Sequence, residues 1–123
     1  MSKRPIGILG GMGPEATIVL QQRLMAAIPA ARDDGDHIPL LIDMNTQVPS
    51  RIDRLIKGCG ADPAPVLAQM ARRLEAAGAV ALAMPCNTAH HYATDICDAV
   101  KIPFINMVSL SAKIASQKAE NHE

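Results

Sequence analysis

Cys86 is the side chain of this sequence best placed to do chemistry. It follows an apolar run at residues 80–84 and Pro85, and it precedes Asn87 and Thr88. Proline suits the end of a strand because it cannot donate to a β-ladder, and Asn and Thr are residue types that cap a first helical turn. A cysteine between a strand and the positive end of a helix dipole lies where a thiolate is stabilised and reactive. We therefore expect Cys86 to act as a nucleophile, a metal ligand or a general base, against the alternative of a small buried hydrophobe.

A glycine-rich turn near the amino terminus offers a second place for chemistry. Residues 11–16, Gly-Met-Gly-Pro-Glu-Ala, match the fingerprint of a dinucleotide-binding turn, and Asp43 could serve as the ribose-binding acid. Glu15, however, places a carboxylate where a pyrophosphate would rest on the helix. Two alternatives remain, namely backbone N–H groups that approach a small carboxylate, or a tight turn without a ligand. Met12 is expected over the crevice beside this turn, whereas Met25, Met44, Met70 and Met107 are interpreted as core residues.

The stretch at residues 45–65 is the longest one without a hydrophobic period. A long connection in a small domain often carries function. Arg51 and Arg54 lie in it, and Arg51–Lys57 could form a helical turn or two. A loop arginine is either solvated or binds a substrate carboxylate through two parallel hydrogen bonds, and the sequence leaves both interpretations open.

His90 and His91 raise the question of a metal, because His90 lies four residues after Cys86. Adjacent histidines point to different helix faces, and no second Cys/His pair completes a closed zinc site. We therefore expect no metal, and we expect His90 to line or support the Cys86 pocket. Cys59, in a loop, and Cys97, in a helix, are interpreted as cysteines that behave as small hydrophobes.

Strand and helix patterns alternate four times along the chain and would position these residues. The expected strands lie at residues 5–9, 37–44, 80–84 and 102–108. The expected helices run from Pro14 to Pro29, from Pro65 to Gly78, from Thr88 to Val100 and from Ser109 to Lys118. This alternation predicts an α/β fold, a doubly wound parallel four-stranded sheet with helices on both faces. Ligands bind such sheets outside the carboxyl ends of the strands, where residues 10–13, 43–47, 85–88 and 106–109 would meet.

The length and composition of the chain indicate one domain with an aliphatic core. The chain has 123 residues, of which 49% are hydrophobic, and it contains no Trp, one Tyr and one Phe. Lys and Arg equal Asp and Glu at 12 each, which indicates neither nucleic acid nor an anionic membrane as a partner. No apolar run approaches the roughly 20 residues of a membrane span, and the amino terminus does not resemble a secretion signal. Three cysteines without framework spacing favour a reducing, cytoplasmic location.

Three stretches of the chain resemble the aspartate/glutamate racemase family. They are residues 8–17 (Ile-Leu-Gly-Gly-Met-Gly-Pro-Glu-Ala-Thr), 45–51 (Asn-Thr-Gln-Val-Pro-Ser-Arg) and 84–90 (Met-Pro-Cys-Asn-Thr-Ala-His). They lie in the order of the family, and the resemblance covers essentially the whole chain. Members of this family are cofactor-independent amino-acid racemases with two similar α/β domains, each of which supplies one catalytic cysteine.

The resemblance implies a role for each matching residue. Cys86 would be one of two acid/base thiols, and Arg51 would bind the side-chain carboxylate of aspartate or glutamate. No cofactor is implied, since a base on one face of the α-carbon and an acid on the other suffice to invert it. The substrate-binding residues that the resemblance implies are Met12, Asn45, Gln47, Arg51, Asn87 and Thr88.

The resemblance stops where the second domain of the family would begin. We expect residues 1–118 to form one half of a pseudo-symmetric two-domain racemase, residues 119–123 to be a frayed tail, and the second domain to be absent. Neither Cys59 nor Cys97 lies where an opposing thiol should. The chain is therefore expected to be inactive alone and to work as a homodimer or with the missing domain. Two alternatives are a non-catalytic dicarboxylate-binding half-domain and a nucleotide-binding oxidoreductase domain.

Overall fold

The computed structural model describes residues 3–106, which fold around a four-stranded parallel sheet. Its strands are β1 (Ile6–Gly10), β2 (Leu40–Met44), β3 (Ala81–Ala83) and β4 (Phe104–Ile105), in the order β2-β1-β3-β4. Strand β1 pairs with β2 on one side and β3 on the other, so that Ile8 lies opposite both Ile42 and Ala83. Because β1 is central, four of its five residues are buried. All four predicted strands are present, although β4 is shorter than expected.

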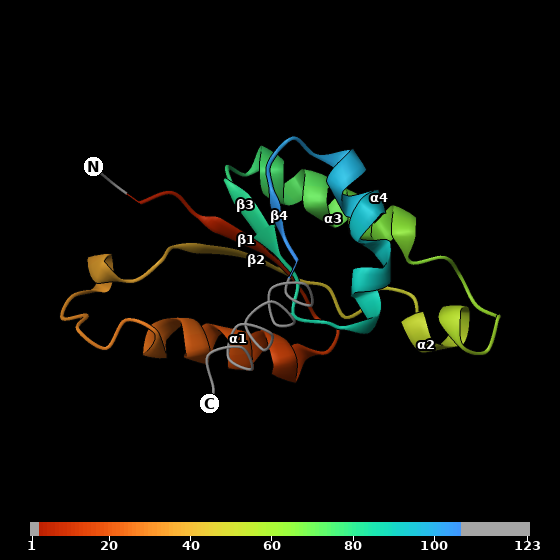
Figure 1. The fold of residues 1–123 in the computed structure, drawn as a ribbon, viewed down its shortest axis with the longest axis horizontal. Helices are drawn as coiled ribbons and strands as arrows, with labels where there is room; N and C mark the ends of the chain where they lie inside the picture. The colour runs from red at the N-terminus through yellow and green to blue at the C-terminus, as the bar shows by residue number, and fades with distance from the viewer. Residues whose placement is uncertain (1–2, 107–123) are drawn as a thin grey trace, which may run out of the picture.

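Helices cover both faces of this sheet, as predicted (Figure 1). Helix α1 lies on one face, and helices α3 and α4 lie on the other. The helices are α1 (Pro14–Ala26), α2 (Arg51–Leu55), α3 (Ala64–Ala76) and α4 (Ala93–Ala99), with 3₁₀ turns η1 (Asp34–Asp36) and η2 (Thr88–Tyr92). The doubly wound α/β fold predicted from the sequence is therefore confirmed.

Local sequence signals explain where these helices begin and end. Pro14 occupies the first position of α1, where a missing N–H costs nothing. Ser50 caps α2 by accepting a hydrogen bond from the Asp53 N–H at 3.1 Å. Gly78 follows the end of α3 with a φ of +107°, a conformation that favours glycine.

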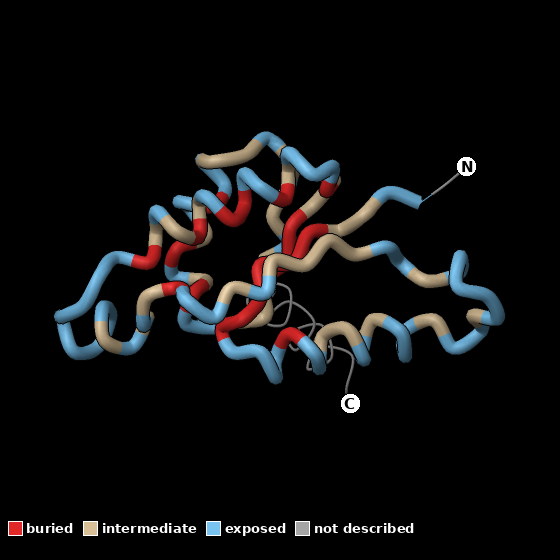
Figure 2. The backbone as a smooth tube through the Cα atoms, turned by 180° about the vertical axis from the view of Figure 1, so that it is seen from behind, coloured by how far each residue is buried: buried red, intermediate tan, exposed pale blue. Residues whose placement is uncertain are grey.

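The core lies between the sheet and α3. Leu67, Met70 and Leu74 of α3 are buried against Leu9 of β1 and Leu82 of β3. Figure 2 shows the buried backbone concentrated in the sheet and in the helices above it, while most of α1 is exposed or half-buried. Two methionines predicted for the core, Met25 and Met44, are exposed because the α1 side of the sheet buries much less than the α3 side.

One predicted helix start is wrong. Asn87 and Thr88 were expected to cap an α-helix through their side chains, but the chain enters the 3₁₀ turn η2 and makes no side-chain cap. Asn87 has helical φ and ψ angles of −62° and −45°, whereas a capping side chain needs an extended backbone at its own position. Met107, the predicted helix at 109–118 and the predicted tail at 119–123 lie outside the described residues.

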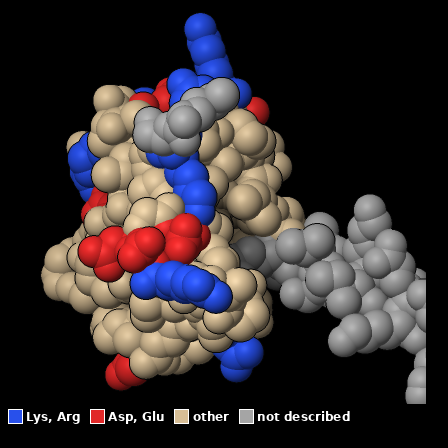
Figure 3. Space-filling model, turned by 90° about the vertical axis from the view of Figure 1, so that its left-hand side faces the viewer, with Lys and Arg blue, Asp and Glu red and all other residues tan. Residues whose placement is uncertain are grey.

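Charged side chains of both signs lie side by side on the face that Figure 3 shows. Between residues 3 and 106, no helix has the length and apolar character that crossing a membrane requires.

Candidate functional site

A pocket of about 350 Å³ opens at the carboxyl ends of β1 and β3. The chain runs from β1 to β2 in one direction and continues to β3 and β4 in the other, so the pocket lies at the switch point of the sheet. Crevices at such switch points are the usual ligand sites of doubly wound folds. The pocket is lined by Met12, Ala16, Met84, Pro85, Cys86, Asn87, Thr88 and His90.

The Cys86 thiol is half-buried and faces this pocket. Its Sγ lies 3.4 Å from the hydroxyl of Thr88. Its backbone N–H donates to the Met84 carbonyl at 2.9 Å, which closes a tight turn around Pro85. The sulfur that the sequence singled out is therefore at a pocket with a hydroxyl partner, not enclosed in the core.

His90 lines the pocket behind Cys86, as the sequence predicts. Its Nδ1 lies 2.6 Å from the Cys86 carbonyl oxygen, and its ring packs against Phe104 with centroids 5.6 Å apart. Asn87 and Thr88 are exposed at the pocket mouth. A bound ligand could therefore reach the thiol, one amide and one hydroxyl together.

The glycine turn forms the other wall of the pocket and needs its glycine at position 11. Gly11 has a φ of +96°, and a Cβ there would lie 2.4 Å from the backbone carbonyl of Asn45. Its N–H donates to Thr17 Oγ1 at 3.0 Å. Met12, the next residue in the chain, is buried and lines the pocket. The turn therefore determines how closely a ligand can approach the sheet.

Thr17 is a supporting residue that the sequence analysis missed. It is the one buried residue of α1, and its hydroxyl holds the Gly11 N–H inside the turn. Its sequence signal is a threonine one helical turn after the glycines, whose hydroxyl can reach back to the N–H groups of the turn.

The loop at residues 45–51 does not line this pocket. Asn45 packs its backbone against Gly11, and its Oδ1 accepts the Gln47 N–H at 2.9 Å. Gln47 is exposed, and its amide donates to Thr46 Oγ1. Arg51 Nη1 donates to the carbonyls of Val48 and Pro49 at 3.4 and 3.2 Å. The structure thus brings Met12, Cys86, Asn87 and Thr88 together at one pocket. Asn45 and Gln47 lie in the neighbouring loop, and Arg51 is the first residue of α2.

The other two cysteines are exposed, which corrects the expectation that they behave as small buried hydrophobes. Cys59 lies in the loop after α2, and Cys97 lies on the surface of α4. Cys59 is in a loop that contributes no residue to the core, and Cys97 is on the solvent side of α4, next to Ile96, which is the residue that this helix buries. Neither lines the Cys86 pocket.

Asp43 is already engaged by another residue. Its Oδ2 accepts hydrogen bonds from Arg73 Nε and Nη2 at 3.2 and 2.6 Å. A ribose-binding acid would need a free carboxylate, so this geometry disfavours the dinucleotide interpretation. Within residues 3–106, no group of three or more His, Cys, Asp or Glu side chains is arranged to hold a metal ion.

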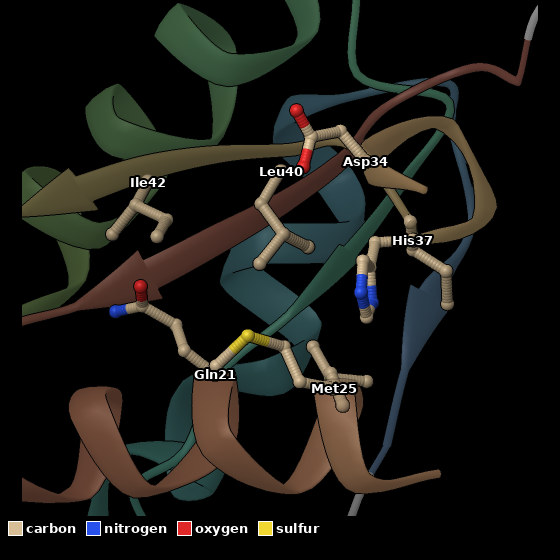
Figure 4. A pocket seen from close by; sticks show the side chains of 8 residues that line it. Gln21, Met25, Asp34, His37, Leu40 and Ile42 are labelled. Carbon is tan, nitrogen blue, oxygen red and sulfur yellow. The ribbon is translucent and has the colours of Figure 1, made fainter. Parts of the chain in front are cut away.

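A second pocket, of about 460 Å³, lies between α1 and β2 (Figure 4). Gln21 and Met25 of α1 face Leu40 and Ile42 of β2 across it, and His37 lies at one end. His37 precedes β2, so this end of the pocket is at the amino edge of the sheet, opposite to Cys86. Its lining contains no cysteine, which leaves the Cys86 pocket as the better candidate for covalent or acid/base chemistry.

Comparison with known proteins places the chain in a family. The sequence profile of the family described as Asp/Glu/Hydantoin racemase matches residues 9–122. The broad specificity amino-acid racemase RacX of Bacillus subtilis (strain 168) is 32% identical over 111 residues, which are 88% of this chain and 48% of RacX. The chain therefore belongs to the Asp/Glu/hydantoin racemase family, and the resemblance stated from its motifs is confirmed.

Two solved structures share the fold. The aspartate racemase of Picrophilus torridus superposes with a TM-score of 0.83 at 29% identity, covering 94% of this chain and 48% of that one. An aspartate racemase homologue from Pyrococcus horikoshii OT3 gives a TM-score of 0.73 at 24% identity, covering 99% and 50%, and supports the fold alone. The chain spans about half the length of the relatives it matches.

Proposed function

We propose that this chain supplies one half of a cofactor-independent amino-acid racemase site, in which Cys86 moves the α-proton of an acidic amino acid. The observation that carries the proposal is the Cys86 thiol facing a pocket at the switch point of the sheet, 3.4 Å from the Thr88 hydroxyl. Membership of the Asp/Glu/hydantoin racemase family supports the reaction type.

Two acid/base groups are needed to invert the α-carbon. The Cys86 thiolate removes the α-hydrogen as a proton, and the electron pair of the broken C–H bond is delocalised into the substrate carboxylate. A protonated thiol on the opposite face then returns a proton to carbon. Among residues 3–106, Cys86 is the one cysteine at this pocket. The opposing thiol would come from a second domain or from a second copy of the chain, and the isolated monomer would not racemise.

The substrate would be aspartate or glutamate. Asn87 and Thr88 would orient it through their exposed polar groups at the pocket mouth, and Met12 would shape the wall beside it. Asn45, Gln47 and Arg51 would contribute from the neighbouring loop. Arg51 would then exchange its contacts with the carbonyls of Val48 and Pro49 for the side-chain carboxylate, which offers a charged acceptor in place of two neutral ones.

Incubation with L-aspartate or L-glutamate in D₂O tests the proposal. If a homodimer completes the site, α-deuteration and the D-isomer should increase more steeply than linearly with chain concentration. Cys86→Ser should abolish both, because a hydroxyl is a far weaker base, whereas Cys97→Ser should change neither. Exchange that persists in Cys86→Ser contradicts the role of this thiol, and no exchange at any concentration contradicts the homodimer.

The presence of one cysteine at the pocket also favours a second candidate function, a dicarboxylate-binding half-domain without chemistry. Calorimetric titration with L-aspartate distinguishes the two. Binding that Arg51→Gln weakens, together with an absence of α-exchange at every concentration, would favour the binding function.

A further inference from the structure

We propose that His90 is a positioning residue for Cys86, which acts by holding the backbone carbonyl of the cysteine rather than by touching the thiol. This inference rests on the proposed role of Cys86, since it explains how that thiol is directed into its pocket. It assigns His90 a defined tautomer and a defined contact atom.

The hydrogen bond itself fixes which ring nitrogen carries the hydrogen. A carbonyl oxygen only accepts, so the 2.6 Å contact between His90 Nδ1 and the Cys86 oxygen requires a hydrogen on Nδ1. The other ring nitrogen, Nε2, is buried and has no hydrogen-bond partner in the described part of the chain. A hydrogen on Nε2 would be a buried donor without an acceptor, and such donors are disfavoured. Both ring atoms therefore indicate the Nδ1–H form.

The His90 side chain makes a hydrogen bond to the Cys86 carbonyl that the backbone would make in an α-helix but does not make in a 3₁₀ turn. In an α-helix the His90 N–H would donate to the carbonyl four residues earlier, which is that of Cys86. Here the His90 N–H donates to the Asn87 carbonyl at 3.2 Å, as a 3₁₀ turn requires. The Cys86 carbonyl accepts a hydrogen bond from the His90 ring instead. Packing of the ring against Phe104 of β4 ties this contact to the sheet.

Cys86 is thereby held at both ends of its backbone. Its N–H is bound to the Met84 carbonyl at 2.9 Å, and its C=O is bound to His90. With both peptide groups fixed, the direction of the Cα–Cβ bond is fixed, and the sulfur has few positions to occupy. In the observed position Sγ is within 3.4 Å of Thr88 Oγ1, where the hydroxyl can donate to a thiolate.

Two substitutions at His90 separate the proposed contact from a general structural role. In His90→Asn the side-chain amide nitrogen can take the place of Nδ1, and in His90→Gln it takes the place of Nε2 instead. The readout is the rate at which iodoacetamide alkylates Cys86 in the full chain, measured for each cysteine by peptide mass spectrometry. Cys59 and Cys97, both exposed, serve as internal controls.

We expect His90→Gln to slow alkylation of Cys86 by about fivefold, the factor that one ordinary hydrogen bond provides. His90→Asn should stay within about twofold of the unchanged chain, because the donor to the carbonyl is retained. The matched control is His91→Gln, at an exposed neighbour that does not line the pocket, and it should have no effect. Equal effects of His90→Asn and His90→Gln, or no effect of either, would overturn the proposal.

Thr88→Val tests whether His90 acts through the direction of the thiol. In that background the sulfur has lost its hydroxyl partner, so His90→Gln should slow alkylation little further. If the double variant slows alkylation of Cys86 by the product of the two single-variant factors, the proposal is overturned.

A measurement on the unsubstituted chain remains decisive where a variant does not fold. The ¹⁵N chemical shifts of the His90 ring report which nitrogen carries the hydrogen, and a ring without a hydrogen on Nδ1 would overturn the assignment. Neither alkylation nor ring shifts need a substrate. A failure to racemise would therefore refute the proposed function alone, and normal alkylation in His90→Gln would refute this inference alone.

Discussion

Helices α1 and α3 each contain 13 residues and lie on opposite faces of the same sheet, but they are attached to it differently. Helix α3 buries Leu67, Met70, Ala71 and Leu74, whereas α1 buries Thr17 alone. Three apolar residues of α1, Ile18, Val19 and Met25, are 43–54% exposed. The core of the described chain is therefore one-sided.

The two faces also differ in the empty space beside them. An apolar pocket of about 320 Å³ separates Leu20 and Leu24 of α1 from Ile8 of the sheet, and it adjoins the pocket of Figure 4. Helix α1 is held instead at its amino end, where Thr17 binds the glycine turn. Apolar burial therefore carries the stability on the α3 face, while polar contacts at one end position α1 and the wall of the Cys86 pocket.

The largest effect should come from shortening a leucine on the α3 face. Leu67→Ala removes a fully buried side chain and should lower the free energy of unfolding by about 3 kcal/mol. Leu24→Ala, at a half-buried position of α1, should cost about 1 kcal/mol, because less apolar area is lost to water. Urea unfolding of the two variants measures the difference. Equal losses would show that the two faces contribute equally and that the comparison is wrong.

The polar attachment of α1 should give the next largest effect. Thr17→Val keeps the shape of the side chain but leaves the Gly11 N–H buried without its acceptor, at a cost of about 2 kcal/mol in unfolding free energy. The same substitution at Thr94, on the exposed surface of α4, is the matched control and should stay within about 0.5 kcal/mol. If both substitutions change the unfolding free energy equally, the hydrogen bond to the glycine turn does not hold α1.

Tyr92 offers a smaller effect that depends on pH. Burial raises the pKa of its phenol, the Asp62 carboxylate adds to this, and the hydroxyl has no hydrogen-bond partner within residues 3–106. Removing that hydroxyl in Tyr92→Phe should therefore raise the unfolding free energy by about 1 kcal/mol near neutral pH.

The same substitution should also change the response to alkali. Above a pH of about 10 the phenol of the unfolded chain ionises first, and the folded chain, whose phenol has the raised pKa, binds more protons. Stability that is complete below this pH is then lost as the pH rises, and Tyr92→Phe lacks this loss. Denaturant unfolding at several pH values should show the gap between the two proteins widening. A constant gap would contradict the burial of the hydroxyl.

Sequence patterns predicted the parts of the fold that depend on near neighbours in the chain. The apolar runs located all four strands, and Pro14 and Gly78 marked one helix start and one helix end. The apolar run at residues 80–84 also indicated that Cys86 comes directly after a strand, which places Cys86 at the carboxyl edge of the sheet. The one-sided core was not predicted, because the spacing of Leu20, Leu24 and Met25 is the same whether or not a partner surface covers them.

The details of the candidate site depend on contacts that residue types do not specify. Asn87 is a good capping residue, but its helical backbone prevents a cap. The sequence leaves open whether Arg51 is solvated or binds a ligand, and in the structure it contacts two carbonyls within three residues of itself. Such local hydrogen bonds are decided by the φ and ψ angles of the loop, so a sequence pattern shows which groups are present and not where they point.

The smallest effect tests whether polar contacts also hold α3. Arg73 joins α3 to Asp43 of β2 through an ion pair of 2.6 Å that is partly exposed. Because exposed pairs contribute little, Arg73→Gln should lower the unfolding free energy by about 0.5 kcal/mol, and high salt should remove most of the difference. Arg23→Gln, at an exposed position of α1 that forms no ion pair within residues 3–106, is the control and should have no salt-dependent effect. A loss from Arg73→Gln comparable to that from Leu67→Ala would show that α3, like α1, is held by polar contacts, and the contrast between the two faces would then fail.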